Sequence, residues 1–399
     1  MVVRPLVTVV IPTHNRAATL KEALDSVYGQ EGVGQQFDLE VIVVDDASTD
    51  ETSQVVSRYP AGRYVRHATN RGPAAARNTG IRESTGSLVA LLDDDDVWLP
   101  HKLALQIPTL EAHPEAGGIY SHIRIEFGDR AYVWPDLSYT PRGSVFRDLL
   151  LTNSIPTPSV LIRREAFAKA GYFDEQLTSA EDYDMMLRVA FHFPFVFVPG
   201  VVAVYRQRPD GGLFSSCLTG RHAENLRQTI GKALELLAPT PANTRFTQEI
   251  RALTDLQIAL FMAWVERWDL VHQHLLNVLR TSPLMVRAPT PRRNFAWLAA
   301  REALTSASPL TRAALLSHEI AGAAGFRRLG LSEWLALRRL QSGLWFELAA
   351  GLAGMHRLGS GKAAVFAALL DPTKLARRSF WQLLLRGRTA RRETRPARP

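Results

Sequence analysis

The sequence predicts an α/β protein with an open, mostly parallel sheet flanked by helices, followed by an α-helical C-terminal domain. Two observations support this prediction. Apolar runs such as 7–11, typical of strands buried on both faces of a parallel sheet, alternate with amphipathic helices over residues 7–92. Beyond about residue 218 the only clear periodicity is helical. Right-handed crossovers would turn the first pattern into an open sheet.

Each of the first elements has a local reason. Pro12 ends the first strand, and Asn15 is placed to cap the helix that follows. Ser48 and the two residues after it open a second helix, and Pro73 suits the first turn of a third. The expected strands are 7–11, 39–44, 64–67 and 88–92, and the expected helices are 15–30, 48–58 and 73–86.

After about residue 117 the pattern loosens into mixed strands and loops. We expect strands in 118–127, 159–163 and 195–205, and a helix over 180–191. The composition changes near residues 214–218, where Ala, Leu and Arg become frequent. We therefore predict an α/β domain over 1–215, an α-helical accessory domain over 216–373, and a basic C-terminal helix and tail over 374–399.

The net charge of +8 is concentrated at the C-terminal end of the chain. Residues 374–399 contain nine Lys/Arg and one Glu, so the preceding residues carry equal numbers of basic and acidic groups. A pI near 9.8 therefore does not indicate a nucleic-acid-binding surface, and we expect no nucleic-acid partner. The basic end interleaves Trp381 and leucines with arginines, a pattern typical of helices that lie on anionic membranes. The alternative is packing of Trp381 on the helical domain.

Cysteine content and hydrophobic runs narrow the class of protein further. A single cysteine, Cys217, excludes an internal disulfide framework and suits a reducing compartment. The segment before the first predicted strand is too short, and the strand itself too strand-like, for a signal peptide. No run of about 18 apolar residues occurs, so the sequence predicts no transmembrane helix. We expect a cytoplasmic protein, peripheral on the inner face of the membrane if the basic end binds there.

Acidic residues follow two of the predicted strands, where open α/β sheets bind ligands. Asp45 and Asp46 follow one strand, and four consecutive acids, 93–96, follow another. Clustered carboxylates at this position suit Mg²⁺ or Mn²⁺, which share their coordination with substrate phosphates. The alternative is a solvated acidic loop or a helix cap. The loop 12–16 contains neither a dinucleotide-binding glycine pattern nor a phosphate-binding loop.

Five motifs in order resemble the family 2 glycosyltransferases. They are TVVIPTHNR at 8–16, VIVVDDASTD at 41–50, NRG at 70–72 with ARN at 76–78, LDDDDVWLP at 92–100, and GYFDE at 171–175 with EDYDMMLR at 181–188. The resemblance covers residues 5–215. It implies a GT-A fold, a nucleotide diphosphate sugar donor and transfer with inversion.

The resemblance implies positions for the donor and the metal. The residues placed at the nucleotide sugar are Pro12, Thr13, His14, Asp46, Arg71, Arg77, Asp93 and Asp94. Asp46 would accept a hydrogen bond from the imide N–H of a base, which favours a UDP- or dTDP-sugar. The alternative for the two arginines is salt bridges at the sheet edge. Asp95 would hold the Mn²⁺ or Mg²⁺ ion.

The chemical step requires a base on the acceptor hydroxyl. Asp182 matches the base proposed for the family, and Glu181 is the alternative. Capping of the predicted helix is a third interpretation of both acids. Arg206 and Arg208 lie where the family often has a loop that closes over the donor.

These features together predict a metal-dependent, inverting glycosyltransferase of the hexosyltransferase type. The expected acceptor is a glycan or a lipid-linked hydroxyl, in cell-surface glycan or polysaccharide synthesis. The alternative from another class is a membrane-adaptor or scaffold protein with a degenerate transferase domain. A nucleotidyltransferase is disfavoured because the loop 12–16 contains no glycine.

Overall fold

The computed structural model describes residues 4–59, 62–128, 130–135, 140–208 and 212–282. The chain divides into two compact units, Met1–Leu237 and Ala238–Pro399. Across the described ranges, no helix combines the length and the apolar character that a membrane span requires.

The first unit begins with the predicted alternation of strands and helices. These elements are β1 (Leu6–Thr13), α1 (Ala17–Tyr28), β2 (Asp38–Asp45), α2 (Thr52–Val56), β3 (Gly62–Arg66), α3 (Pro73–Glu83) and β4 (Leu88–Leu91). The remaining elements of this unit are β5 (Val97–Trp98), α4 (Lys102–Glu111), β6 (Gly118–Phe127), β7 (Arg130–Trp134), α5 (Phe146–Leu151), the 3₁₀ turn η1 (Thr157–Ser159), β8 (Leu161–Arg163), α6 (Arg164–Ala170), α7 (Glu181–His192), β9 (Phe195–Arg206), α8 (Gly212–Leu218) and α9 (Arg221–Glu235).

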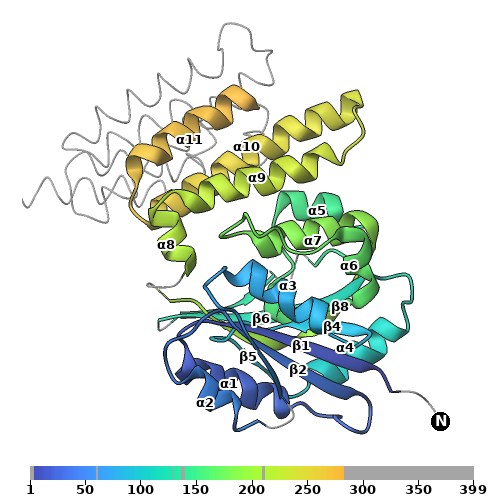
Figure 1. The fold of residues 1–399 in the computed structure, drawn as a ribbon. Helices are drawn as coiled ribbons and strands as arrows, with labels where there is room; N and C mark the ends of the chain where they lie inside the picture. The colour runs from blue at the N-terminus through green and yellow to red at the C-terminus, as the bar shows by residue number, and fades with distance from the viewer. Residues whose placement is uncertain (1–3, 60–61, 129, 136–139, 209–211, 283–399) are drawn as a thin grey trace, which may run out of the picture. The chain divides into compact units, whose positions relative to one another are not determined.

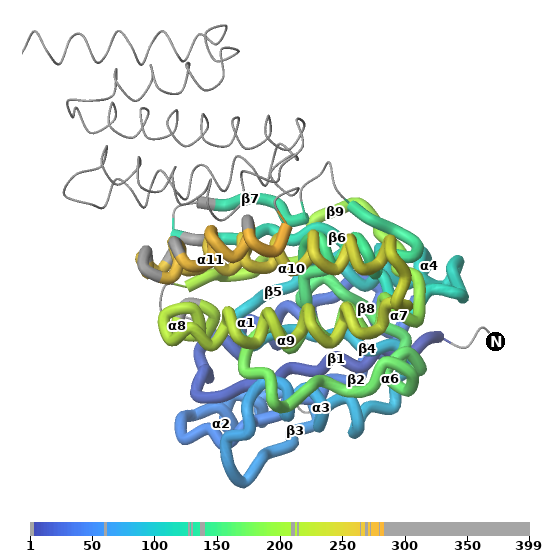
Figure 2. Tube along the Cα trace, turned by 90° about the horizontal axis from the view of Figure 1, so that it is seen from above, coloured from blue at the N-terminus to red at the C-terminus, as the bar shows by residue number. Residues whose placement is uncertain are grey.

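The strands form a nine-stranded sheet in the order β3-β2-β1-β4-β8-β6-β9-β5, with β7 paired to β6. The first four strands are parallel, with β1 between β2 and β4 (Figure 2). Beyond β4 the sheet is mixed, because β8 is antiparallel to both β4 and β6 while β6 and β9 are parallel. The predicted fold class is therefore confirmed, with four adjacent parallel strands at the N-terminal end and one further parallel pair, β6 and β9. The carboxyl ends of β1, β2 and β4 meet at one edge, where the acidic residues follow.

Helices cover both faces of the sheet (Figure 1). The larger core combines Val7, Val9 and Ile11 of β1 with buried apolar residues of α1, α2 and α4. On the opposite face, Ala76 of α3 packs on β2. Helix α3 approaches β1 closely at Gly80, where an added Cβ would lie 2.3 Å from Val10 Cγ1. The two layers of helices fix the strand ends that carry the site.

The start of α1 differs from the prediction for Asn15. Asn15 has a positive φ of 54°, and its Oδ1 accepts a 2.7 Å hydrogen bond from the Thr49 amide. The free amide of Ala17 at the start of α1 donates instead to Asp50 Oδ2 at 3.0 Å. Asn15 therefore ties the loop after β1 to the loop after β2, a role its tolerance of left-handed backbone permits.

The first unit extends past the predicted boundary at residue 215 to include α8 and α9. Helix α9 is anchored to the region before and within α7, because Lys232 Nζ lies 2.8 Å from Asp174 Oδ2 and 2.6 Å from Asp184 Oδ1. In the second unit the structure describes α10 (Pro241–Trp264) and α11 (Trp268–Thr281), which pair as a helical hairpin. Residues 283–399, with the predicted boundary at 373 and the basic tail 374–399, lie outside the described residues.

Candidate active site

An arginine from the loop after β1 lies among the four carboxylates that follow β4. Arg16 Nη1 donates to Asp94 Oδ1 at 2.9 Å and to Asp95 Oδ2 at 2.8 Å. Asp94 also accepts a 2.7 Å hydrogen bond from Thr13 Oγ1. The side chains of Asp94 and Asp95 are only 5% and 16% exposed. Pairing with Arg16 offsets part of the cost of placing these adjacent acids out of water.

Burial shifts these acids towards their neutral forms. It raises the pKa of Asp94 to about 6, against the opposing effect of Arg16. Burial also raises the pKa of Asp95 and of Asp96, and repulsion from Asp93 adds to both shifts. Asp96 is fully buried, and its Oδ2 has no hydrogen-bond partner among the described residues. A further positive charge brought beside this cluster would stabilise its ionised form.

Arg77 on α3 joins the acidic strand end to the start of α7. The residue is 4% exposed, and its guanidinium donates to Asp93 at 2.6 Å and to Glu181 at 2.7 Å. Burial opposes the charge on Arg77, but Asp93 and Glu181 outweigh burial and raise its pKa. The salt bridges expected as the alternative for Arg77 are therefore present, and contact with a nucleotide stays a prediction.

Glu181 and Asp182 both lie in the first turn of α7 but have different surroundings. Glu181 is buried in its ion pair with Arg77, and burial raises its pKa although Arg77 opposes the shift. Asp182 is half-buried and accepts a 2.8 Å hydrogen bond from Thr157 Oγ1 and a 2.7 Å hydrogen bond from the Tyr183 amide. Within the described part of the chain, no cation pairs with Asp182. Its carboxylate is the more available of the two for a substrate proton.

The partner of Asp182 is itself held in place by buried donors. Thr157 is the first of the three residues of the turn η1. The backbone carbonyls of the other two residues accept hydrogen bonds from side chains in the segment that follows the acidic cluster. Trp98 Nε1 donates to the carbonyl of Pro158 at 2.9 Å, and Gln106 Nε2 donates to the carbonyl of Ser159 at 2.7 Å. The hydroxyl that orients Asp182 is therefore fixed by β5 and α4.

Asp46, at the end of β2, organises the loop before α3. Its carboxylate accepts hydrogen bonds from the amides of Arg71 and Gly72, the latter at 2.7 Å, and lies 2.7 Å from His67 Nδ1. The backbone carbonyl of Asp46 is 2.8 Å from His14 Nδ1. The second contact brings Asp46 and His14 together. The role of Asp46 towards a base stays a prediction, and most of its acceptor capacity is used within the protein.

The other residues predicted at the nucleotide are placed around the same edge. Pro12 and Thr13 are buried at the end of β1, and His14 beside them is exposed. The Arg71 guanidinium lies farther along the loop and donates to Glu175 at 2.9 Å. The strand ends thus gather Pro12, Thr13 and His14 with the acids, whereas the Arg71 side chain is directed to an ion pair.

Two side chains of the site were not identified from sequence. Arg16 ends the motif TVVIPTHNR, and an arginine in the loop after one strand, with four acids after the adjacent strand, is the sequence signal for this pairing. Thr157 lies in a stretch with no recognisable pattern, and only the structure places it on Asp182.

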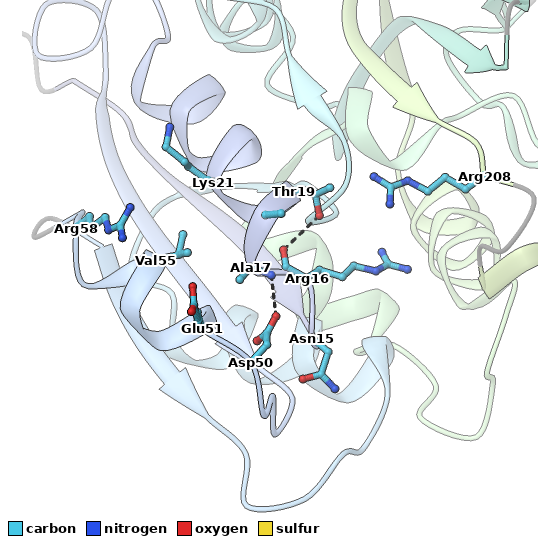
Figure 3. A pocket seen from close by; sticks show the side chains of 11 residues that line it. Asn15, Arg16, Ala17, Thr19, Lys21, Asp50, Glu51, Val55, Arg58 and Arg208 are labelled. Atoms are coloured by element: carbon cyan, nitrogen blue, oxygen red, sulfur yellow. Dashed lines mark hydrogen bonds between the residues drawn. The ribbon is translucent and has the colours of Figure 1, made fainter.

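An open cavity of about 540 Å³ lies at the start of α1, and Arg16 is one of its lining residues (Figure 3). Arg16 comes from the loop after β1 and Arg208 from the segment after β9, and the two side chains extend toward one another in the view. The charge of Arg208 opposes the rise in the Asp95 pKa, as does the charge of Arg16. The remaining lining residues are Asn15, Ala17, Ala18, Thr19, Lys21, Asp50, Glu51, Val55 and Arg58.

The donor set at the strand end suits a hard divalent cation shared with a substrate. Among the described residues, no group of three or more His, Cys, Asp or Glu side chains forms a self-sufficient metal site. Mg²⁺ and Mn²⁺ sites of nucleotide enzymes need fewer, because one or two carboxylates act together with phosphate oxygens and water. Asp95, with Asp94 and the Thr13 hydroxyl beside it, provides such a set.

The mixed sheet, with acidic strand ends at one edge, defines the class of α/β protein with the GT-A fold. Two solved structures share this fold. S. aureus TarS 1–349 in complex with UDP-GlcNAc is 18% identical, with a TM-score of 0.55 over 81% of this chain and 91% of that one. The mannosyltransferase PcManGT from Pyrobaculum calidifontis, in complex with GDP-Man and Mn²⁺, is 24% identical, with a TM-score of 0.52 over 86% of each chain.

The sequence comparisons point to one family within that class. Residues 8–171 match the model of glycosyl transferase family 2. An uncharacterised glycosyltransferase of Haemophilus influenzae is 30% identical over 185 residues, 46% of this chain and 62% of the relative. An uncharacterised glycosyltransferase of Rickettsia felis is 32% identical over 188 residues, 46% of this chain and 30% of the relative. The chain thus matches less than two thirds of either relative's length.

Proposed function

We propose that this protein transfers a sugar from a nucleoside diphosphate sugar to an acceptor hydroxyl, with inversion at the anomeric carbon. The observation that carries the proposal is the Asp93–Arg77–Glu181 bridge. Through it, the acidic strand end and the first turn of α7, which presents Asp182, are parts of one site. We therefore expect a donor bound at the strand end to place its anomeric carbon near a carboxylate base.

In the proposed reaction, Asp182 accepts the proton of the acceptor hydroxyl as the oxygen attacks the anomeric carbon. The bond from that carbon to the diphosphate breaks, and the nucleoside diphosphate leaves with the bonding electron pair. Thr157 orients the Asp182 carboxylate through their 2.8 Å hydrogen bond. Glu181, paired with Arg77, positions the start of α7 instead of taking the proton. Asp95 would hold a divalent cation, which would supply stabilisation of the charge on the departing diphosphate.

The finer parts of the proposal concern substrates and place. We propose a hexosyl donor carried on UDP or dTDP, a glycan or lipid-linked acceptor, and a role in cell-surface polysaccharide synthesis on the cytoplasmic side of the membrane. The nucleotide sugars bound by TarS and PcManGT, UDP-GlcNAc and GDP-Man, support a nucleotide sugar donor in general. The base preference rests on Asp46 alone.

The decisive experiment is donor hydrolysis by the full chain in Mn²⁺, combined with thermal shifts across UDP-, dTDP- and GDP-sugars. A true donor raises the melting temperature by mass action and is slowly hydrolysed. Asp95→Ala should abolish both effects, and excess chelator should abolish hydrolysis. If no donor shifts the melting temperature and none is hydrolysed, the adaptor alternative replaces this proposal.

A further inference from the structure

Arg16 occupies the position that a divalent cation would have to share. Its guanidinium lies 2.9 Å from an oxygen of Asp94 and 2.8 Å from an oxygen of Asp95, while the second oxygen of Asp94 accepts the Thr13 hydroxyl. The Arg16 side chain is 39% exposed, whereas the two carboxylates are nearly covered. The guanidinium therefore meets the acids while part of the side chain stays open to solvent.

We propose that Arg16 is an internal counter-ion that competes with the metal for Asp94 and Asp95 and transfers to the donor diphosphate when the metal binds. The consequence is that metal and nucleotide bind cooperatively, each weakly without the other. This inference rests on the proposed function, because it takes the metal and the diphosphate from it.

Charge arithmetic at the strand end explains the competition. A cation on Asp95 and a guanidinium 2.8 Å from the same carboxylate would repel each other, so Arg16 has to leave as the metal arrives. Without another anion, Arg16 loses two ion pairs in that step, which lowers the affinity for the metal. Phosphate oxygens suit a guanidinium well because its N–H groups match their geometry in pairs. A donor diphosphate would replace the lost partners.

The surroundings of Arg16 permit the movement. Its side chain is partly exposed and lines an open cavity of about 540 Å³, so it is not enclosed by packing. Arg208 extends toward Arg16 from the end of β9 (Figure 3) and makes no ion pair within the described residues. The guanidinium groups of Arg16 and Arg208 therefore line the same cavity, and a diphosphate bound there would be close to both.

Thermodynamic linkage makes the proposal measurable without any transfer reaction. Reciprocity requires that UDP, dTDP or GDP tighten Mn²⁺ binding by the factor by which Mn²⁺ tightens binding of that nucleotide. Arg16→Gln removes the competing charge. It should tighten binding of Mn²⁺ alone by about 5-fold or more, the lower range of coupling between sites, and should reduce the enhancement by nucleotide.

The test is a Mn²⁺ titration of the full chain followed by electron paramagnetic resonance, with and without each nucleoside diphosphate. Arg58→Gln is the matched control, because Arg58 lines the same cavity but makes no ion pair with the acids. It should leave Mn²⁺ affinity unchanged. Arg16→Lys keeps the charge but not the planar fork, and should lie between wild type and Arg16→Gln. Circular dichroism melts verify that each variant is folded.

The outcomes separate this inference from the proposed function. If wild-type protein binds Mn²⁺ with nucleotide but Arg16→Gln binds Mn²⁺ alone no more tightly, the counter-ion role is overturned and the metal site stands. If Arg16→Gln weakens binding of Mn²⁺ alone, Arg16 supports the acids instead of competing for them, and the inference is also wrong. If no variant binds Mn²⁺ with any nucleotide, the metal assignment of the proposed function fails first.

Discussion

The adjacent acids Glu181 and Asp182 suit different roles because their neighbours differ. Glu181 is buried and forms an ion pair with Arg77, which also pairs with Asp93. The carboxylate of Glu181 is therefore part of a structural ion-pair network. Asp182 is half-buried, and its hydrogen-bond donors among the described residues are neutral, the Thr157 hydroxyl and a backbone amide. The two residue types alone do not show which carboxylate is the better base. Their contacts in the structure distinguish them.

Asp182→Asn keeps the shape of the side chain and removes its basicity. We expect turnover to fall by about 10²–10⁴-fold, the usual contribution of a general base, with donor affinity nearly unchanged. Steady-state kinetics that report kcat and the KM of the donor separately provide the measurement.

Glu181→Gln is the comparison, because it leaves Asp182 intact but breaks the ion pair with buried Arg77. It should cost stability, about 3–5 kcal/mol for a buried pair that loses one partner, more than it costs the chemical step. A larger loss of turnover in Glu181→Gln than in Asp182→Asn would reverse the two roles.

The composition of the site was only partly predictable from sequence. The acids 93–96 and Asp182 were found because they stand beside an apolar strand and within an ordered motif. The cation that binds two of those acids, Arg16, was overlooked because charge pairing across β1 and β4 depends on side-chain direction. Thr157 reaches Asp182 across 25 residues of chain, with no periodicity to indicate it.

At the level of elements, the packing of α3 on β1 leaves no room for a side chain at Gly80. A Cβ there would lie 2.3 Å from Val10 Cγ1, in the fully buried core. We expect Gly80→Ala to lower the free energy of unfolding by about 1–3 kcal/mol, as overpacking usually does. Urea denaturation followed by circular dichroism measures the loss.

Gly231→Ala is the matched control, since Gly231 lies within helix α9 with open space around the added Cβ. This change should stabilise the protein by about 0.5–1 kcal/mol, because alanine restricts the unfolded chain more than glycine. Equal effects of the two substitutions would contradict the close packing of α3.

Helix α9 makes the stability of the first unit sensitive to acid through His222. This residue is buried near Ser179, and burial lowers its pKa to about 4, although Asp182 opposes the shift. Between about pH 6.5 and pH 4 the unfolded chain binds a proton that the folded chain does not. The free energy of unfolding should therefore fall on acidification through this window, by about 3 kcal/mol from this group.

His222→Asn keeps a polar group near the position of Nδ1 but cannot titrate. Denaturation at several pH values from 4 to 7 should give a flatter pH dependence for the variant than for wild type. Parallel curves for the two proteins would show that His222 does not titrate as its burial predicts.

Across the whole molecule, the sequence predicted what depends on local pattern and missed what depends on distant pairing. Continuous apolar runs indicated the four parallel strands and the order of their helices. The two-residue strand β5 carries no pattern of its own, and it exists because Val97 pairs with Val204. The contacts of α9 with α7, such as the ion pair of Lys232 with Asp184, are of the same kind, and they lie in the compact unit that extends to residue 237.

We propose that the basic segment 374–399, which lies outside the described residues, binds anionic membranes. Each Lys or Arg near such a surface contributes about 1 kcal/mol, so binding should fall as salt is raised. Co-sedimentation of the full chain with anionic vesicles should exceed that of a chain ending at Pro372, with neutral vesicles as the control. Equal sedimentation of both chains would remove this role from the segment.

The anchoring of η1 links the proposed base to a distant part of the chain. Trp98 and Gln106 hold the carbonyls of Pro158 and Ser159, so Thr157 is positioned by β5 and α4. The residues just before it are fixed as well, because Val145, Leu149 and Ile155 are buried and the Leu149 carbonyl accepts a hydrogen bond from the Tyr183 hydroxyl. A substitution in β5 or α4 could therefore change the direction in which Asp182 points without altering any residue that touches it.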